Sequence, residues 1–543
     1  MKFCALHTPY FLCSLTALSI FYSASAWIPH LPKATRAAPR VHNERYSKTS
    51  VKGSFFDSLC SKDDDDTPPE PTAFRPKARV GGWLPTNVED LDTFLSQLTT
   101  AASIAKENQE PLIKPIEDLK NITLQDSVLR ANVRTMFLDA AARQRQTPLS
   151  TPAIENFEQF LHALNLIVQT APAFYTTSAT NDTAAGLIAF PINAILDFPM
   201  STKAGYTVFA NSQVNQQLRK ILNYWSKFLT TEASAYVLSS TDNNALNATL
   251  VPWLDPNATK QVVDVAFQYT GSPAPEDKTF GQVFKTVPGA FNLGFGSWDE
   301  FFTKTFKEGV RPIGGPDGPI WADSDRVVLN ACESAPLALR KNVQLDDSFW
   351  VKDQPYSIRN ILDFDERAVK FDNGTVYQAF LSGLSYHRWH SPVSGTVVKT
   401  KVVGGTYYLE NIEEGFANPD GADESAPNAS QRFLSAVATR GLIFIEADGP
   451  IGLMCFVAVG MSEVSSCDIG VQEGQRVEKG DEIGMFHYGG SSHCLLFRDD
   501  VNLDFSQVQQ RYKTGDFGVN STNVPVKAQL ARVMENSPTL IDL

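Results

Sequence analysis

The chain has 543 residues, more than one hydrophobic core usually fills, so its length predicts two or three domains. Its 43% hydrophobic and 20% charged residues exclude a wholly disordered or fibrous protein. With 47 Lys and Arg against 60 Asp and Glu, the net charge is −13, and this acidic balance argues against nucleic acid as a partner.

The first 26 residues have the features of a secretory signal peptide. Lys2 precedes an apolar run over residues 11–22, and Ala24-Ser25-Ala26 gives the small-x-small pattern that signal peptidase accepts. An uncleaved anchor is the alternative. Seven Asn-x-Ser/Thr sequons support a secretory route weakly. We therefore expect the protein in the secretory pathway, in the ER, Golgi or vacuole lumen, or secreted.

Residues 27–81 have the composition of a disordered linker. They are rich in Pro, Lys and Arg at first and then carry an acidic run at 63–66, followed by Pro68-Pro69-Glu70-Pro71. Such a segment buries too little apolar surface to offset its chain entropy. A propeptide is the alternative interpretation.

Helical periodicity dominates residues 82–238. Apolar residues recur at helical spacing in two stripes, which begin at Phe157 and Leu218. Each stripe needs a partner surface, so we predict a helical N-terminal domain. Residues 239–296, rich in Asn, Asp, Pro and Gly, are predicted to form a connecting region with short helices.

From residue 297 to 543 the apolar period shifts towards that of strands. The β-rich runs are Val397-Val398 and residues 406–409, 442–445 and 453–459. The predicted fold class is therefore α+β, with a helical N-terminal domain followed by a mainly β domain. Five cysteines follow the signal without CxxC spacing, which leaves room for one disulfide but predicts no metal cluster.

The segment Gly489-Gly490-Ser491-Ser492 lies between strand-like runs. Two glycines before a serine permit a strained, closely approached backbone, which an attack of the serine hydroxyl on the preceding carbonyl would need. A plain hairpin turn is the alternative.

A second candidate segment is Tyr386-His387-Arg388-Trp389-His390. Its two histidines lack further Cys or His ligands at a metal-binding spacing, but imidazole titrates near neutral pH and suits acid-base work. Surface or partly buried structural histidines are the alternative. By itself, Glu333 in Ala331-Cys332-Glu333-Ser334 carries no functional signal.

Taken together and in this order, these segments resemble the phosphatidylserine decarboxylase family. The resemblance covers roughly residues 298–497 and includes residues 298–304, 311–313, 331–334, 386–392, 479–484 and 489–492. The N-terminal half is similar to the extended region of the fungal phosphatidylserine-decarboxylase-like enzymes, which include an L-tryptophan decarboxylase. Gly82-Trp83-Leu84 and the segment 200–206 carry that similarity.

The resemblance implies a self-processing proenzyme that is cut between Gly490 and Ser491. Ser491 would become a pyruvoyl group at the start of a small chain, residues 491–543, which stays with the rest of the protein. His390 would be the base that activates Ser491, and Glu333 the carboxylate that orients His390. The family usually has Asp where this chain has Glu333. No metal is implied.

The resemblance also implies decarboxylation, with the pyruvoyl ketone as electron acceptor. His387 is the expected proton donor to the substrate carbon, while His390, His487 and His493 are further candidates. Phosphatidylserine, converted to phosphatidylethanolamine and CO2, is the family's usual substrate, with peripheral membrane contact expected. A free aromatic L-amino acid is the alternative substrate. A non-catalytic secreted protein, which lost processing through the change to Glu333, is the third interpretation.

Overall fold

The computed structural model describes residues 88–145, 154–172, 174–175, 190–239, 250–270, 274–316, 324–346, 356–411, 430–463, 466–488, 491–518 and 521–535. All of these fall in one compact unit, Pro71–Leu543. The predicted signal peptide 1–26, the linker 27–81 and Gly490 lie outside the described residues. The borders predicted at 82, 239 and 297 stay predictions.

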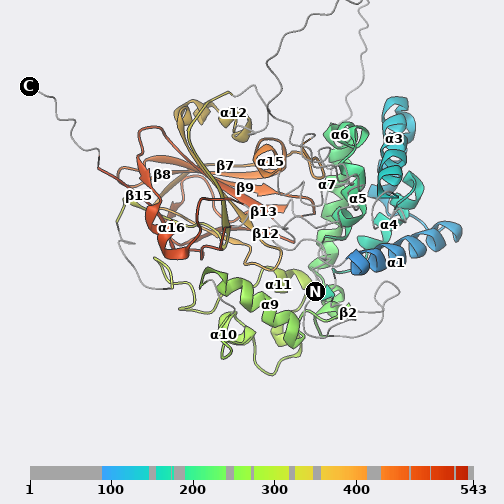
Figure 1. The fold of residues 1–543 in the computed structure, drawn as a ribbon, viewed down its shortest axis with the longest axis horizontal. Coiled ribbons are helices and arrows are strands. Elements are labelled where there is room, and N and C mark those ends of the chain that lie inside the picture. The colour runs from blue at the N-terminus through green and yellow to red at the C-terminus, as the bar shows by residue number, and fades with distance from the viewer. Residues whose placement is uncertain are drawn as a thin grey trace, which may run out of the picture. The chain divides into compact units, whose positions relative to one another are not determined.

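The N-terminal half of the described chain is helical (Figure 1). Its helices are α1 (Val88–Glu107), α2 (Lys114–Gln125), α3 (Ser127–Gln144), α4 (Phe157–Ile167), α5 (Pro191–Met200), α6 (Lys203–Ala210), α7 (Ser212–Leu229), α8 (Tyr236–Ser239), α9 (Pro256–Phe267), α10 (Phe280–Val283) and α11 (Trp298–Phe302). Side chains cap several of these helices, as Asn211 does for α7 by accepting from two backbone amides. The apolar stripes predicted from the sequence are largely buried on α4 and α7.

A seven-stranded antiparallel sheet forms the centre of the C-terminal half. Its order is β11 (Arg476–Val477), β7 (Gly395–Val403), β8 (Arg440–Ala447), β9 (Leu453–Gly460), β13 (Ser491–Phe497), β5 (Gly374–Leu381) and β4 (Ala335–Val343). Two three-stranded sheets accompany it, β10 (Ser466–Ile469) with β12 (Glu482–His487) and β6 (Arg388–His390), and β14 (Leu503–Asp504) with β15 (Gln529–Val533) and β3 (Val327–Leu329). A short two-stranded pair, β1 (Phe174–Tyr175) and β2 (Leu250–Val251), lies in the helical half. The α+β fold predicted from the sequence is confirmed.

One predicted strand is wrong. Residues 406–409 make only an isolated bridge, from Thr406 to Ala438. The Tyr407 amide instead donates to the Asn215 side chain of α7 at 3.2 Å, and its carbonyl accepts from Ser462. Contacts with α7 and with the segment that follows β9 have thus replaced strand pairing, although the β propensity of the segment is high.

Both faces of strand β13 are covered, which explains why all seven of its residues are buried. On one face, Trp389 of β6 packs on Phe456 of β9 with ring centroids 5.3 Å apart. On the other, Gln378 of β5 donates to the carbonyl of Gln431, the first residue of α15 (Gln431–Val437). The short helices α12 (Ile358–Ile361) and α16 (Ser506–Tyr512) complete the C-terminal half.

The helical half packs against one end of the central strands of the large sheet. At this end β13 begins with Ser491, which is paired with the last residues of two neighbouring strands, Gly460 of β9 and Leu381 of β5. Figure 1 shows α5 and α7 beside the ends of these strands. Trp225 of α7 contacts Tyr488, three residues before Ser491, with ring centroids 4.9 Å apart.

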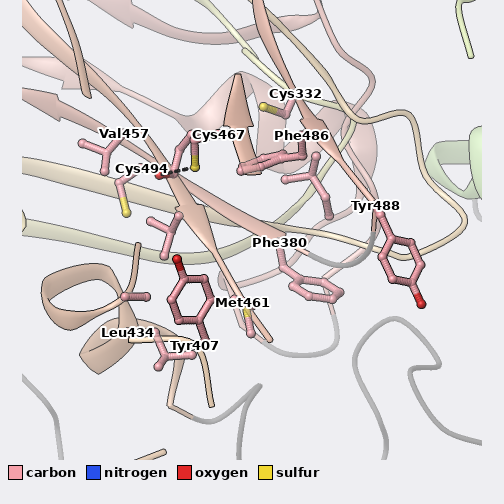
Figure 2. Close-up of a cluster of buried hydrophobic side chains, with 14 of the residues drawn as sticks. Cys332, Phe380, Tyr407, Leu434, Val457, Met461, Cys467, Phe486, Tyr488 and Cys494 are labelled. Atoms are coloured by element: carbon pink, nitrogen blue, oxygen red, sulfur yellow. Dashed lines mark hydrogen bonds between the residues drawn. The ribbon is translucent and has the colours of Figure 1, made fainter. Parts of the chain in front are cut away.

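Four of the cysteines are described, Cys332, Cys455, Cys467 and Cys494, and each is a buried free thiol. Figure 2 shows three of them among the hydrophobic side chains of the core, together with Phe486 and Tyr488. The disulfide allowed by the sequence therefore has no counterpart among these four. None of the helices in the described ranges is both long and apolar enough to cross a membrane.

Candidate active site

Ser491 and Ser492 have different surroundings although they are adjacent in β13. The Ser492 hydroxyl accepts from Gln378 Nε2 at 2.9 Å and donates to the carbonyl of Ala379 at 3.1 Å. Ser491 Oγ is fully buried and has no hydrogen-bond partner among the described residues. An orphaned buried hydroxyl is costly, so it marks a position under functional constraint. Of the two serines, the structure singles out Ser491.

His390 lies at the end of β6, and both its ring nitrogens are engaged. Nδ1 lies 2.8 Å from the carbonyl oxygen of Gly480, which can only accept, so Nδ1 carries the proton. Burial, aided by the Lys527 and Arg388 charges, lowers the pKa of His390 to about 3. The ring is therefore neutral at pH 7, and Nε2 accepts from the Tyr386 hydroxyl at 2.8 Å.

Glu333 is engaged elsewhere. Its carboxylate accepts from Arg311 Nε at 2.9 Å and from Arg311 Nη2 at 2.8 Å, and both side chains are almost fully buried. The Asn523 side-chain amide and the Val526 backbone amide each donate to it at 2.9 Å. With four donors, this carboxylate forms no hydrogen bond to His390. The relay predicted between Glu333, His390 and Ser491 is thus not hydrogen-bonded in this structure, and the roles of the three residues stay predictions.

His387 directly precedes β6. Its ring is fully buried and stacks on Phe302 of α11, with ring centroids 4.1 Å apart. Phe302 also contacts Tyr488, with a centroid separation of 5.9 Å. One aromatic side chain therefore links His387 to the segment that leads into Ser491. This placement suits the predicted role of His387 as a proton donor.

The two remaining candidate histidines differ in charge state. His487 Nδ1 lies 3.0 Å from both Asp299 carboxylate oxygens, and this hydrogen bond raises the pKa of His487. His493 lies two residues after Ser491, on the same face of β13, between Phe456 and Tyr377. Burial lowers the pKa of His493 to about 3, so it is a neutral core residue at pH 7.

Sequence reasoning gave no role to three buried polar residues near these groups. Tyr386 holds His390, as described above. Lys304 donates to the carbonyl of Ser385 at 3.1 Å, and burial lowers its pKa to about 7. Glu463 follows β9 at the end of the sheet where Ser491 begins β13, and no sequence signal distinguishes it from an acidic residue at the surface. Among the described residues, no group of three or more His, Cys, Asp or Glu side chains could hold a metal ion.

The arrangement offers a nucleophile without a partner and an aromatic environment that excludes water. Trp225 and Trp298 meet the Tyr488 ring edge to face, with ring centroids 4.9 and 4.6 Å apart. The imidazoles of His387 and His390 lie in the same half of the molecule, and an imidazole can gain and lose a proton in general acid-base chemistry. The geometry is therefore suited to reactions at Ser491 in a dry site.

Comparison with known proteins identifies the family to which the chain is similar. A phosphatidylserine decarboxylase model matches residues 298–517, and a second phosphatidylserine decarboxylase model matches residues 113–262. Decarboxylase iboD of Amanita muscaria (strain Koide BX008) is 37% identical over 330 residues, 58% of this chain and 86% of that protein. L-tryptophan decarboxylase of Psilocybe cubensis is 31% identical over 442 residues, 80% of this chain and 91% of that protein.

More distant relatives match a smaller part of the chain. Phosphatidylserine decarboxylase proenzyme 3 of Schizosaccharomyces pombe is 28% identical over 225 residues, which are 41% of this chain and 21% of that protein. The similarity to iboD and to L-tryptophan decarboxylase, in contrast, spans most of those proteins' length. The chain therefore belongs to the phosphatidylserine decarboxylase family and is a decarboxylase, a carboxy-lyase similar to these fungal enzymes.

Proposed function

We propose that the protein is a self-processing, pyruvoyl-dependent decarboxylase of a free aromatic L-amino acid. The observation that carries this proposal is the extent of the similarity. The L-tryptophan decarboxylases of two Psilocybe species match 80–83% of the chain, including its helical half, whereas phosphatidylserine decarboxylase proenzyme 3 of Schizosaccharomyces pombe matches 41%. This favours the alternative substrate over phosphatidylserine, to which the family's usual activity had pointed.

The aromatic surroundings of the site support the same substrate class. Phe190 stacks on Tyr488 with ring centroids 6.3 Å apart, and Trp225 and Trp298 contact the same ring. Phe190 and Trp225 come from the helical half of the chain. Aromatic side chains pair well with an aromatic substrate through offset and edge-to-face contacts.

The residues present fit a pyruvoyl group. Enzymes of this family use such a group, and here it would form from Ser491, whose buried and unpartnered hydroxyl is free to react. When formed, its ketone would accept the electrons released as the carboxylate leaves as CO2. His387 would hold the proton that returns to the substrate carbon, and His390 would accept the proton of the Ser491 hydroxyl during processing. The aromatic cluster formed by Tyr488, Phe190, Trp225 and Trp298 would exclude water.

A substrate panel with purified protein tests the function. CO2 release should occur with tryptophan, tyrosine or phenylalanine, and neither with serine nor with phosphatidylserine vesicles. Hydroxylamine, which consumes a ketone, should abolish it. Turnover of phosphatidylserine alone would contradict the proposal. An unprocessed, inactive chain would favour the non-catalytic alternative, and Ser491→Ala supplies the matched inactive control.

The secretory route is a further proposal. Three of the seven sequon asparagines are described, Asn121, Asn257 and Asn373, and all three are exposed, as glycosylation requires. Treatment of protein from the native host with an N-glycosidase should lower its apparent mass. An unchanged mass together with an intact residue 1–26 segment would contradict this route.

A further inference from the structure

Glu463 is the acidic side chain closest in sequence to the end of β9. Because Gly460 of β9 pairs with Ser491, residues just after Gly460 lie at the same end of the sheet as the start of β13. Glu463 is only 4% exposed. Its Oε1 atom accepts from the backbone amide of Asn193, in the first turn of α5, at 2.7 Å. The carboxyl therefore connects the helical half to this end of the sheet.

The second oxygen of this carboxyl has no partner. Glu463 Oε2 is buried and has no hydrogen-bond partner among the described residues. The backbone amides of Ile192 and of Glu463 itself also act on the carboxyl, but no described Lys or Arg side chain forms an ion pair with it. The nearby Tyr408 hydroxyl, which interacts electrostatically with Glu463, is also buried without a hydrogen-bond partner. A buried carboxyl normally has a cation or a full set of donors, since desolvation without them is costly. The unpartnered oxygen is therefore available to a polar group of a bound molecule.

The group also faces the candidate substrate site. Glu463 interacts electrostatically with Tyr488, three residues before Ser491, and Tyr488 stacks on Phe190, the residue before α5. Helix capping alone would explain Oε1. It would not explain the open Oε2 beside an aromatic cluster at the start of β13.

We propose that Glu463 is a substrate-binding residue whose open oxygen receives the α-ammonium group of the amino-acid substrate, while the aromatic cluster receives its side chain. The site thus takes a primary ammonium beside an apolar or aromatic group. This inference rests on the proposed function for its free amino-acid substrate. The serine head group of phosphatidylserine carries the same ammonium, so the experiment includes both.

The charge state of Glu463 agrees with this role. Burial raises the pKa of Glu463 to about 8, so its carboxyl is protonated at pH 7 before a cation arrives. An entering ammonium favours the ionised form, and binding should then release a proton. The other titratable groups that interact with Glu463, Tyr408 and Tyr488, have pKa values that burial raises further above pH 7, so they do not contribute.

The test compares two ligands that cannot react with the processed enzyme. N,N-dimethyl-L-tryptophan keeps a cationic nitrogen but, as a tertiary amine, cannot condense with a ketone, and indole-3-propionate lacks the nitrogen. Calorimetry should show at least tenfold tighter binding of the cationic ligand to the wild type. In Glu463→Gln, which keeps an acceptor for the Asn193 amide, the two affinities should fall within about twofold of each other. An unchanged preference would overturn the proposal.

Two controls separate binding from stability. Thr202→Ala removes the side-chain cap of α6, so it should lower the melting temperature without changing the ligand preference. If Glu463→Gln does not fold, proton release by the wild type decides the matter. Calorimetry at pH 7 in two buffers of different ionisation enthalpy should detect close to one proton released per cationic ligand and none with indole-3-propionate. No release with the cationic ligand would overturn the proposal.

A parallel panel distinguishes the two sources of the ammonium. If the wild type decarboxylates phosphatidylserine vesicles but not tryptophan, the proposed function fails, and Glu463→Gln should then reduce vesicle turnover at least tenfold. If the wild type decarboxylates tryptophan and Glu463→Gln keeps the ligand preference, the inference on Glu463 fails and the proposed function stands.

Discussion

The ion pair between Arg311 and Glu333 allows a prediction that separates folding from catalysis. Glu333→Gln neutralises the carboxylate and leaves the Arg311 guanidinium, which is 3% exposed, without its charge partner. The neighbouring rings of Phe306 and Tyr269 and the Ala266 carbonyl, which accepts from Arg311 Nη2, do not replace a negative charge. Breaking a buried pair on one side costs about 3 to 5 kcal/mol.

We therefore expect Glu333→Gln to lower the free energy of unfolding by about 3 to 5 kcal/mol. The measurement is urea denaturation in a Ser491→Ala background, so that every variant remains uncut. Arg311→Met combined with Glu333→Gln removes the uncompensated charge and should recover most of the loss. Glu333→Asp, shorter by one methylene, should lose part of the four-donor set and cost about 1 to 3 kcal/mol.

The relay hypothesis predicts a different outcome. If Glu333 acts only by orienting His390, Glu333→Gln should fold normally, and the protein with Ser491 intact should process slowly. Unfolding within about 1 kcal/mol of the parent, together with cleavage slowed a hundredfold or more, would refute the ion-pair reasoning. A stable double variant that still fails to cut would assign Glu333 to both roles.

The remaining predictions concern processing and pH. Ser491→Ala should leave one uncut chain in intact-mass analysis, whereas Ser492→Ala, which lacks a hydroxyl that is already hydrogen-bonded, should still release residues 491–543; the reverse pattern would reassign the cleavage site. In gel time courses, His390→Ala should slow cleavage about 10² to 10⁴-fold, while Tyr386→Phe should still cut because the imidazole lone pair remains, and normal cutting by His390→Ala would exclude it as the base. Folding raises the pKa of His487, so its hydrogen bond to Asp299 stabilises the fold fully below the unfolded-state pKa of about 6.5, and this stabilisation is lost as pH rises through the folded-state pKa. The difference in melting temperature between the wild type and His487→Gln should therefore shrink from pH 6 to pH 9. A gap that stays constant with pH would remove this contribution.

Patterns among residues close in sequence predicted much of the fold. The apolar stripe that begins at Leu218 became the buried face of α7, and the glycine-bounded run over residues 453–459 became β9. The segment after Gly490 begins a strand at Ser491, in line with the expectation of strand-like runs on both sides of the glycine pair. These features depend on residues close in sequence, whose periodicity a single chain displays.

Long-range contacts could not be predicted in this way. The partner of Glu333 is Arg311, 22 residues earlier, and the remaining donors come from around residue 525. Nothing in the spacing of these residues distinguishes a buried ion pair from a catalytic carboxylate. The same holds for residues 406–409, where the β propensity is real but a side chain of α7 supplies the hydrogen bond that a neighbouring strand would have supplied.

The helical half shows why the candidate site could not be predicted from the C-terminal motifs alone. Its sequence carries no recognisable chemistry, yet Phe190 and Trp225 contact the ring of Tyr488, and the first turn of α5 binds the Glu463 carboxyl. Under the proposed function, the motifs around Ser491 would fix the reaction, since they would provide the group that reacts. Under the proposed function, residues from both halves would surround the substrate, so substrate choice would depend on the helices as well as on β13.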